Sequence, residues 1–515
     1  MGRPNRFKRV ILSHLHQVKG GLALSALCVV GFTLTELSRP WPLKIIFDHI
    51  LLDTPLTSAL SFLGEIFQRG KVLSLVVLSL SIVLIAILRG LFSYSQLYIT
   101  SRIGYQMVYR LRRELFAHLQ RLSLSFHNRA RSGELLTKVT SDTNTLKDLF
   151  AESALTFAAQ LLTLIGMFTI MFALNWKLSL IAVTTIPILF YILYLLHHRI
   201  KVSARTQRKK EGKIASRISE VLATVTLVQA FGRERYEAER FDMENAKSLE
   251  ESIRTARMEA AATRTVEIVS AFGTWAVVLF GSLQVLKGHM TPGDVLIFAS
   301  YLTNMYRPIR NLARLSTQFS KAMISAERIT EILEMEPDIQ DDPQAIEAFN
   351  LKGEIVFEDV SFDYGNGKGV LRNVSLTISP GQRVALLGAS GAGKSTIVSL
   401  ILRLYDPCEG SILIDGVSIK KYQRESLRRQ IGVVLQDSVL FGTTIRENIA
   451  YGKPDATVEE ILAAAKAANA HDFIIELENG YDTIIGERGG TLSGGQRQRI
   501  AIARALIRNA PILVL

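Results

Sequence analysis

The sequence contains one segment whose residue types and spacing can grip a phosphate chain. Gly388-Ala-Ser-Gly-Ala-Gly-Lys-Ser395 fits the pattern G-x-x-x-x-G-K-[ST]. Glycines let successive backbone N–H groups turn toward one anion, and a helix that starts after them adds its positive end. Lys394 can reach the outer phosphates, and the hydroxyl of Ser395 can ligate Mg²⁺. The segment predicts a phosphate-binding loop, whose further lining residues are Ala389, Ser390, Gly391, Ala392, Gly393 and Thr396.

The flanking sequence predicts the strand–loop–helix setting that such a loop requires. Arg383–Leu387 predicts a buried strand, and Ser395–Tyr405 predicts a helix. Two β-rich runs, Gly353–Val360 and Val370–Ile378, precede the loop, and helical and strand-like stretches alternate after it. This part of the chain is therefore predicted to be an α/β domain. A glycine-rich turn that binds nothing is the competing interpretation of the loop.

A second run of small residues lies near the end of the sequence. Leu492-Ser-Gly-Gly-Gln496 precedes Arg497–Ile507, which predicts a helix with Ile500, Ala503 and Ile507 on one face. Small residues thus open a helix N-terminus, where backbone N–H groups can face an anion. Because many helices begin in this way, the run does not define a site by itself.

Long uncharged apolar runs occupy the first part of the chain, up to about residue 335. The chain has 515 residues, 48% of them hydrophobic, and a mean hydropathy of +0.23. This composition excludes an intrinsically disordered chain. Several of the apolar runs are close to the ~20 residues that a helix needs to cross the hydrocarbon of a membrane. Their length argues against the alternative that they are buried helices of a soluble protein. We predict six spans, at residues 20–52, 72–98, 153–175, 178–196, 268–286 and 295–315.

Positive charges are distributed unevenly between the predicted loops. The loops after the second and fourth spans are rich in arginine and lysine, and the alternate loops carry few. By the positive-inside rule, both long loops and both termini face the cytoplasm. Residues 1–19 are basic and lack a clean cleavage site, so they predict an amphipathic elbow helix rather than a signal peptide. The net charge of +13 is compatible with nucleic acid, anionic lipid or nucleotide as a partner.

Composition changes near Glu336. Residues 336–350 are acidic and polar, and they predict a linker between a membrane domain at 20–335 and an α/β domain at 351–515. Cys28 and Cys408 lie far apart without metal-ligand spacing. Neither a disulfide framework nor a zinc site is therefore expected.

Charged residues lie in or near the first predicted span. They are Glu36, Arg39 and Asp48. Charges at membrane depth are costly and often functional. Pro40, Trp41 and Pro42 predict a broken helix near an interface, where the same charges would be solvated. A transport role and a solvated position both stay open.

Six predicted spans, the phosphate-binding loop and Leu492–Gln496 together resemble an ATP-binding-cassette (ABC) exporter half-transporter, nearest to the bacterial multidrug and lipid-flipping group. The resemblance covers nearly the whole chain. It implies a multi-domain fold, with a six-helix α-helical transmembrane domain followed by an α/β P-loop NTPase nucleotide-binding domain. It also implies that the loop binds ATP, that Ser395 and Gln436 hold Mg²⁺, and that Lys394 and Gln436 are catalytic.

Further residues match positions of that family. Tyr364 falls where the family stacks an aromatic ring on adenine, and an ordinary strand tyrosine is the alternative. Glu487 resembles an acidic loop residue that touches the membrane domain, and simple surface charge is its alternative. Two segments, 122–142 and 228–241, resemble the family's coupling segments, with Phe126, His127, Phe231 and Gly232 as their candidate contact residues.

The resemblance implies a two-fold dimer of half-transporters. Leu492, Ser493, Gly494, Gly495 and Gln496 would act on ATP held by the partner's loop. A homodimer is expected and a heterodimer is possible, in the bacterial plasma (inner) membrane with the nucleotide-binding domain in the cytoplasm. The expected cargo is a lipid, a drug or another amphipathic small molecule, and no nucleic-acid partner is expected.

The sequence departs from the family at its end. Pro511–Leu515 predicts a buried parallel strand, after which the family has an aspartate for Mg²⁺, a glutamate that polarises water and a later histidine. The sequence given stops at Leu515. It is therefore predicted to be a fragment of a longer gene product, with little ATPase activity by itself.

Other classes of protein share some of these features. A soluble ATPase of the same superfamily is excluded if the spans insert. An importer is disfavoured because its membrane and cassette parts usually lie on separate chains. An ATP-binding membrane regulator, or an ATP-gated channel without coupled transport, shares every motif named above and stays open.

Overall fold

The computed structural model describes residues 19–55, 70–130, 132–149, 154–365, 367, 369–436, 438–486 and 491–515. The predicted elbow helix therefore lies outside the described residues, apart from its last residue. The chain divides into two compact units. The first contains the described residues up to Glu114 together with Lys138–Leu333, and the second contains Leu115–Thr137 and Glu334–Leu515.

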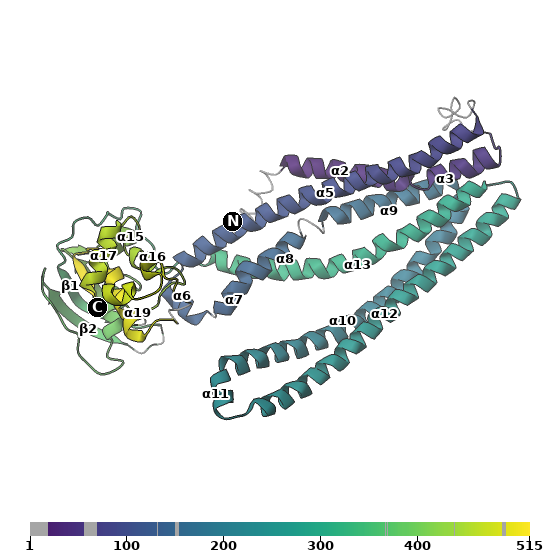
Figure 1. The fold of residues 1–515 in the computed structure, drawn as a ribbon. Coiled ribbons are helices and arrows are strands. Elements are labelled where there is room, and N and C mark those ends of the chain that lie inside the picture. Colours follow the sequence, from purple (N-terminus) through teal and green to yellow (C-terminus); the bar gives the residue numbers. More distant parts are fainter. Residues whose placement is uncertain are drawn as a thin grey trace. The chain divides into compact units, whose positions relative to one another are not determined.

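The first unit consists of helices, several of them much longer than a membrane is thick (Figure 1). Its elements are α2 (Lys19–Ser38), α3 (Trp41–Ile45), the π-helix η1 (Ile46–Leu51), α5 (Lys71–Arg121), the π-helix η3 (Lys138–Asp142), α8 (Thr143–Lys147), α9 (Ala154–Leu174), α10 (Trp176–Ala223), α11 (Val225–Ala230), α12 (Glu234–Leu286) and α13 (Pro292–Glu334). At 1.5 Å per residue, α12 alone is roughly 80 Å long. Such helices span hydrocarbon and continue well beyond it.

Four helical stretches of the described chain are long and apolar enough to cross a membrane. They are Lys19–Leu51, Lys71–Arg121, Leu155–Leu174 and Glu234–Leu286. The other two predicted spans, 178–196 and 295–315, fall inside α10 and α13. The expected break of the first span is confirmed, since α2 ends at Ser38 and α3 begins at Trp41. The predicted span at 295–315 includes Pro308, and α13 likewise continues through this proline to Glu334.

A hydrophobic core joins α9, α10, α12 and α13. Tyr301 is fully buried within it, and its hydroxyl donates to the carbonyl of Leu37 and accepts from Trp41 Nε1 at 3.1 Å. Figure 1 shows α10 and α12 running side by side as a hairpin whose tip is α11. The core therefore holds one end of this hairpin, and its other end projects from the rest of the unit.

Two of the charges near the first span, Glu36 and Asp48, are used in contacts within the first unit, and Arg39 is exposed. Asp48 is completely buried, and its carboxylate accepts from Thr291 Oγ1 at 2.6 Å and from the backbone N–H of Gly293 at 2.8 Å. Only a glycine fits at 293, because a Cβ there would lie 2.4 Å from the Asp48 carboxylate. Arg89 Nε lies 2.5 Å from Glu36 Oε2, an ion pair between α5 and α2. Asp48 therefore fastens the first span to the start of α13.

We expect Asp48→Ala to lower the thermal stability of the full-length protein in detergent by a few degrees. The substitution leaves the buried N–H of Gly293 and the partly buried hydroxyl of Thr291 without this acceptor, and an unsatisfied buried group costs about 1–3 kcal/mol. Asp53→Ala is the matched control, because the Asp53–Lys71 ion pair is mostly exposed and surface pairs contribute little. Equal melting temperatures for the two variants would show that Asp48 does not fasten α13.

The second unit combines two β-sheets with short helices. Strands β1 (Ile355–Phe362), β2 (Leu371–Ile378), β3 (Glu409–Ile414) and β4 (Val417–Ser418) form an antiparallel sheet of order β2-β1-β3-β4, and β5 (Ile431–Val433) pairs in parallel with β6 (Ile512–Val514). The remaining elements are α6 (Leu124–Arg129), α7 (Ser132–Thr137), α14 (Lys394–Ile401), the 3₁₀-helix η5 (Ile419–Lys421), α15 (Arg424–Arg429), α16 (Ile445–Ala450), α17 (Val458–Ala467), α18 (His471–Ile475), the 3₁₀-helix η6 (Gly480–Asp482) and α19 (Gly494–Leu506). Both expected β-rich runs are confirmed. The final strand pairs in parallel as expected, but it is not buried throughout, since Leu513 is 45% exposed.

Two hydrophobic cores divide this unit into a sheet lobe and a helical lobe. The sheet lobe packs β1, β2, β3 and α14 around Phe357 and Leu400. The helical lobe packs α16, α17, α18 and α19 around Ile449 and Ile500. The expected apolar face of α19 is confirmed, because Ile500, Ala503 and Ile507 are all buried in this second core.

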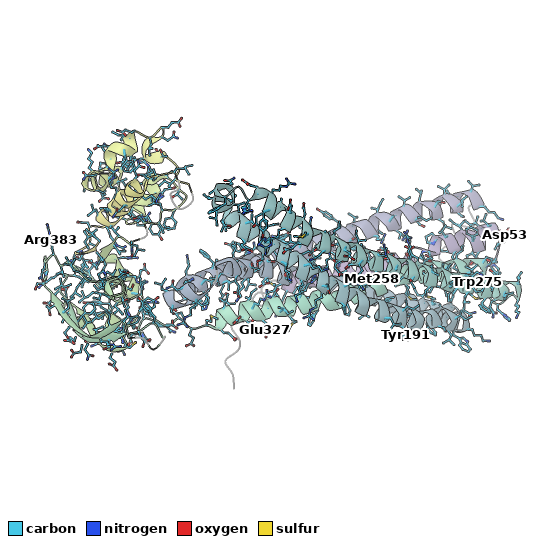
Figure 2. All side chains as sticks on the ribbon, turned by 90° about the horizontal axis from the view of Figure 1, so that it is seen from below. Asp53, Tyr191, Met258, Trp275, Glu327 and Arg383 are labelled. Carbon is cyan, nitrogen blue, oxygen red and sulfur yellow. The ribbon has the colours of Figure 1, made fainter. Side chains whose placement is uncertain are left out.

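The predicted buried strand before the phosphate-binding loop is wrong in this structure. Arg383–Leu387 has no strand assignment and is exposed, with Leu387 at 92% (Figure 2 labels Arg383). A strand needs a neighbouring strand to pair with. Among the described residues, neither sheet offers one to this segment.

Candidate functional site

The phosphate-binding loop leads directly into helix α14. Gly391 and Gly393 have φ values of +83° and +90°, a region that side-chain-bearing residues rarely adopt. A Cβ on Gly393 would also lie 2.7 Å from Leu371, so glycine is required there. The loop thus curls around the N-terminus of α14, where unpaired N–H groups and the helix dipole favour an anion.

Two side chains of the loop are disposed toward its ligand-binding face. Lys394 Nζ donates to the carbonyl oxygens of Gly388 and Ala389, each at 2.9 Å, so the ammonium lies over the loop. Ser395 is exposed in the first turn of α14. A cation over the loop and an exposed hydroxyl beside it suit a phosphate chain and its Mg²⁺. The residues therefore fit both groups.

Tyr364 belongs to an aromatic cluster beside α14. Its ring meets those of Phe362 and Tyr405 edge-on, with centroid distances of 4.9 and 5.2 Å. Its hydroxyl lies 2.9 Å from Thr396 Oγ1, and the residue remains 38% exposed. Tyr364 is therefore held firmly next to the phosphate-binding loop and still offers ring surface to a ligand. Thr396 itself is buried, and its hydroxyl is the partner of Tyr364.

Helix α6, in the first candidate coupling segment, packs against this same cluster within the second unit. Asn128 Nδ2 donates to Tyr405 Oη at 3.3 Å, and Arg129 Nη2 lies 3.5 Å from the carbonyl oxygen of Tyr364. Phe126 is partly buried and meets the His127 ring edge-on. His127 is exposed and bonds through Nε2 to the carbonyl of Leu119.

The start of α6 is fixed by a carboxylate from the predicted linker. Asp338 Oδ2 accepts from Ser123 Oγ at 2.5 Å and from Ser125 Oγ at 2.7 Å. These two hydrogen bonds hold the pKa of the Asp338 carboxyl below its usual range. Residues 336–350 are thus ordered along the second unit, and Ala348 and Ile339 within them are buried. Arg403, also buried, donates to the carbonyl oxygens of Gln340 and Tyr422.

For two of the expected site residues, Gln436 and Glu487, the structure describes no contact with the phosphate-binding loop. Gln436 is exposed in the segment that follows the carboxyl end of β5, and no hydrogen bond joins it to the loop in the described chain. Glu487 lies outside the described residues.

The second small-residue run caps helix α19. The hydroxyl of Ser493 accepts from the N–H of Gln496, and the Gln496 side chain accepts from the N–H of Ser493 at 2.8 Å, a reciprocal capping box. Ser493, Gly494 and Gly495 are exposed, and Leu492 is buried in the helical core. The run is therefore an accessible helix N-terminus on a different lobe from the phosphate-binding loop.

The second candidate coupling segment is the tip of the α10–α12 hairpin. Phe231 is 71% exposed, and Gly232 follows it at a φ of +58°. A groove of about 330 Å³ next to them has a mainly apolar lining that includes Ile218, Val221 and Val225. An exposed aromatic beside an apolar groove is typical of a surface that contacts protein.

Sequence reasoning missed Asp338, Tyr405 and Arg403. Each makes a contact with residues far away along the chain, and no periodicity or motif marks it. A carboxylate in a predicted linker was the only available signal, and it is an ambiguous one.

Family models match both parts of the chain. Residues 22–309 match the ABC transporter transmembrane region, and residues 371–515 match the ABC transporter family model. A membrane-spanning helical domain fused to a nucleotide-binding domain defines an ATP-driven membrane transporter with ATPase activity. The chain belongs to the ABC transporter family, and its architecture is that of an exporter half-transporter, which binds ATP and assembles with a second half-transporter.

Individual relatives and a solved structure resemble most of the chain. The ATP-dependent lipid A-core flippase of Syntrophus aciditrophicus is 37% identical over 489 residues, covering 94% of this chain and 81% of the relative. The putative multidrug export ATP-binding/permease protein YgaD of Bacillus subtilis is 36% identical, covering 95% and 82%. A bacterial Atm1-family ABC exporter with ATP bound superposes with a TM-score of 0.77 at 29% identity, covering 96% of this chain and 85% of that one.

We expect Asp338→Ala to loosen α6 from the second unit. Each lost hydrogen bond is worth about 1 kcal/mol, which corresponds to roughly fivefold in local opening. Amide hydrogen exchange of residues 124–129 in the full-length protein should accelerate accordingly. Because folding lowers the pKa of Asp338, the stabilisation is present above the unfolded pKa of this carboxyl and is lost as pH falls through the folded value.

The control for this experiment is Asp342→Ala. Asp342 is exposed in the same segment, and its carboxylate accepts from the N–H of Gln344 nearby in the chain. Exchange in α6 that responds equally to both substitutions would contradict a specific role for Asp338.

Proposed function

We propose that this chain exports or flips an amphipathic compound, a lipid or a drug, across the bacterial plasma membrane as one half of a two-fold dimer. The observation that supports this proposal most directly is that one chain combines a phosphate-binding loop, at the N-terminus of α14, with long apolar helices. Relatives named as a lipid A-core flippase and a multidrug export protein support this range of cargo.

The proposed ATP site combines the loop with the aromatic cluster. The residues Gly388 to Thr396 surround the phosphates, Lys394 neutralises their charge, and Tyr364 stacks on adenine. Ser395 and Gln436 would hold Mg²⁺, which would help to neutralise the charge of the phosphates. With little covalent chemistry for the protein to perform, Lys394 and Gln436 act by positioning and electrostatics.

We propose that each ATP lies between two chains. Leu492–Gln496 of one chain presents its exposed helix N-terminus to the γ-phosphate on the partner's loop, which explains why the two motifs occupy separate lobes. ATP then draws two nucleotide-binding domains together. Because ATP favours the closed pair, it shifts the membrane helices from inward-open to outward-open, and hydrolysis restores the first state. A homodimer is the simplest arrangement.

Two contacts carry this motion in the proposal. The first is helix α6, which contains Phe126 and His127. This helix is hydrogen-bonded to the aromatic cluster that contains Tyr364. The second is the hairpin tip with Phe231 and Gly232. Glu487, by the family resemblance, is a candidate for contact with the membrane domain. The excess of basic residues in the long loops supports a cytoplasmic position for all of these segments.

Lys394→Ala should abolish ATPase activity in the full-length protein, because the developing charge on the phosphates loses its nearest cation. Phosphate release by the purified variant, reconstituted in liposomes, measures the effect. Lys453→Ala, which removes an exposed lysine paired with Glu460, should leave turnover unchanged. Undiminished turnover in Lys394→Ala would refute the assigned site.

A disulfide cross-link can test whether the ATP sites form between chains. We expect the double variant Ser390→Cys/Ser493→Cys, on a Cys408→Ser background, to give a disulfide-linked dimer when it is oxidised with ATP bound. Cys408 is exposed and is replaced, while Cys28 is buried. A cross-link that stays within one chain would contradict the shared site. Each single cysteine variant serves as the control.

Uptake of labelled lipid or drug into inside-out vesicles separates the proposal from its alternative. ATP-dependent accumulation that stops in Lys394→Ala supports an exporter. Flux that equilibrates the compound without coupled ATP turnover would instead identify an ATP-gated channel or regulator.

A further inference from the structure

The C-terminal end of α14 is closed by an arginine in a backbone conformation that favours glycine. Arg403 follows the last turn of the helix with a φ of +48°. Its N–H bonds to the carbonyl of Leu400, and the N–H of Leu404 bonds to the carbonyl of Ser399. This pattern is a Schellman C-cap, in which the left-handed position is usually glycine. An arginine there points to a role of its side chain.

The guanidinium group of Arg403 binds the linker segment, defined here as residues 335–348. The residue is only 3% exposed. Its Nη2 donates to the carbonyl of Gln340 at 3.1 Å, and its Nη1 lies 3.5 Å from the Asp341 carboxylate. Nη1 also donates to the carbonyl of Tyr422 at 3.0 Å. Because the planar guanidinium holds several acceptors in a fixed geometry, the end of α14 and the linker segment are tied together.

The same linker segment is also joined to the ends of long helices. His118 Nε2 of α5 lies 3.0 Å from the carbonyl oxygen of Met335, and His118 is buried. Asp338 accepts from the two serines at the start of α6, as described above. Helix α13 ends at Glu334 and leads directly into the segment. The linker segment therefore connects the C-terminal end of α14 with α5, α6 and α13.

The phosphate-binding loop lies at the opposite end of α14. The helix has eight residues, so roughly 12 Å separates its two ends. A phosphate bound at the loop would satisfy N–H groups of the first turn and so reduce local opening of the helix. Because Arg403 bonds directly to Gln340, a helix that opens less also holds the linker segment more firmly.

We propose that Arg403 is a positioning residue, through which nucleotide at the phosphate-binding loop orders the linker segment and the adjoining end of α5. The proposal rests on the proposed binding of ATP by the loop, and it requires no movement of cargo. An arginine that only stabilised the fold would protect the linker segment to the same degree with and without nucleotide.

Amide hydrogen exchange of the full-length protein in detergent, with and without Mg²⁺ and a non-hydrolysable ATP analogue, tests this role. In the wild type, we expect the analogue to slow exchange of residues 391–398, 339–348 and 115–121 by roughly threefold or more. In Arg403→Gly, which suits the left-handed backbone, residues 391–398 should still be protected, while 339–348 and 115–121 should no longer respond.

Two further variants keep this test decisive. Arg424→Gln is the matched control, because Arg424 also bonds to Asp341 but belongs to α15, and its linker segment should respond as in the wild type. Arg403→Lys retains the charge and much of the volume, and it should lose the response because lysine lacks the planar set of donors. It replaces Arg403→Gly if that variant fails to fold.

Two outcomes would overturn the proposal. One is a linker segment that responds equally in the wild type and in the Arg403 variants. The other is a wild-type linker segment that does not respond although residues 391–398 are protected. If residues 391–398 of the wild type are not protected, the loop does not bind ATP, and both this proposal and the proposed function fail. If they are protected but labelled cargo does not accumulate in vesicles, only the proposed transport fails, and the exchange data still decide the role of Arg403.

Discussion

A backbone that crosses hydrocarbon must satisfy its own hydrogen bonds, and the first unit follows from that requirement. Without water, only helices or closed barrels can meet it. The chain uses continuous helices, and α5, α10, α12 and α13 each run for more than 40 residues. Because an unbroken helix is stiff, a displacement at one end is carried to the other. The need to satisfy backbone hydrogen bonds in the membrane thus also produces long, stiff helices, which can transmit motion in a transporter.

The second unit contains a helix N-terminus that suits an anion. It also contains the last residues of the long helix α5. Helix α5 ends at Arg121, and α6 follows it to bond with Tyr405 and the Tyr364 carbonyl. Tyr364 in turn bonds with Thr396 in the first turn of α14. Side chains from α6 to α14 therefore form one connected set, so a ligand that moves Tyr364 also acts on α6. This connection gives the proposed coupling a physical route within a single compact unit.

The sequence predicted much of the architecture and part of the site. The glycine loop, the capped start of α19 and the apolar helices were all predicted, because each depends on residues within a few positions of one another. The strand prediction for Arg383–Leu387 failed because a short apolar run indicates only a tendency to form a strand, while a strand exists only beside a partner. Asp338 and Tyr405 hold α6 and the aromatic cluster in place beside the phosphate-binding loop. No motif or periodicity in the neighbouring sequence marks either residue.

The sequence alone determined which local segments are able to bind phosphates or to begin a helix. Gly388–Ser395 can bind phosphates and Leu492–Gln496 can cap a helix, since backbone torsions and short-range hydrogen bonds suffice for both. What only the tertiary structure decided was which distant groups share a contact. Asp48 meets Gly293, and Ser123 meets Asp338, because packing of whole helices and lobes brings them together. Such pairings depend on the free energy of the entire fold, and no stretch of neighbouring residues encodes them.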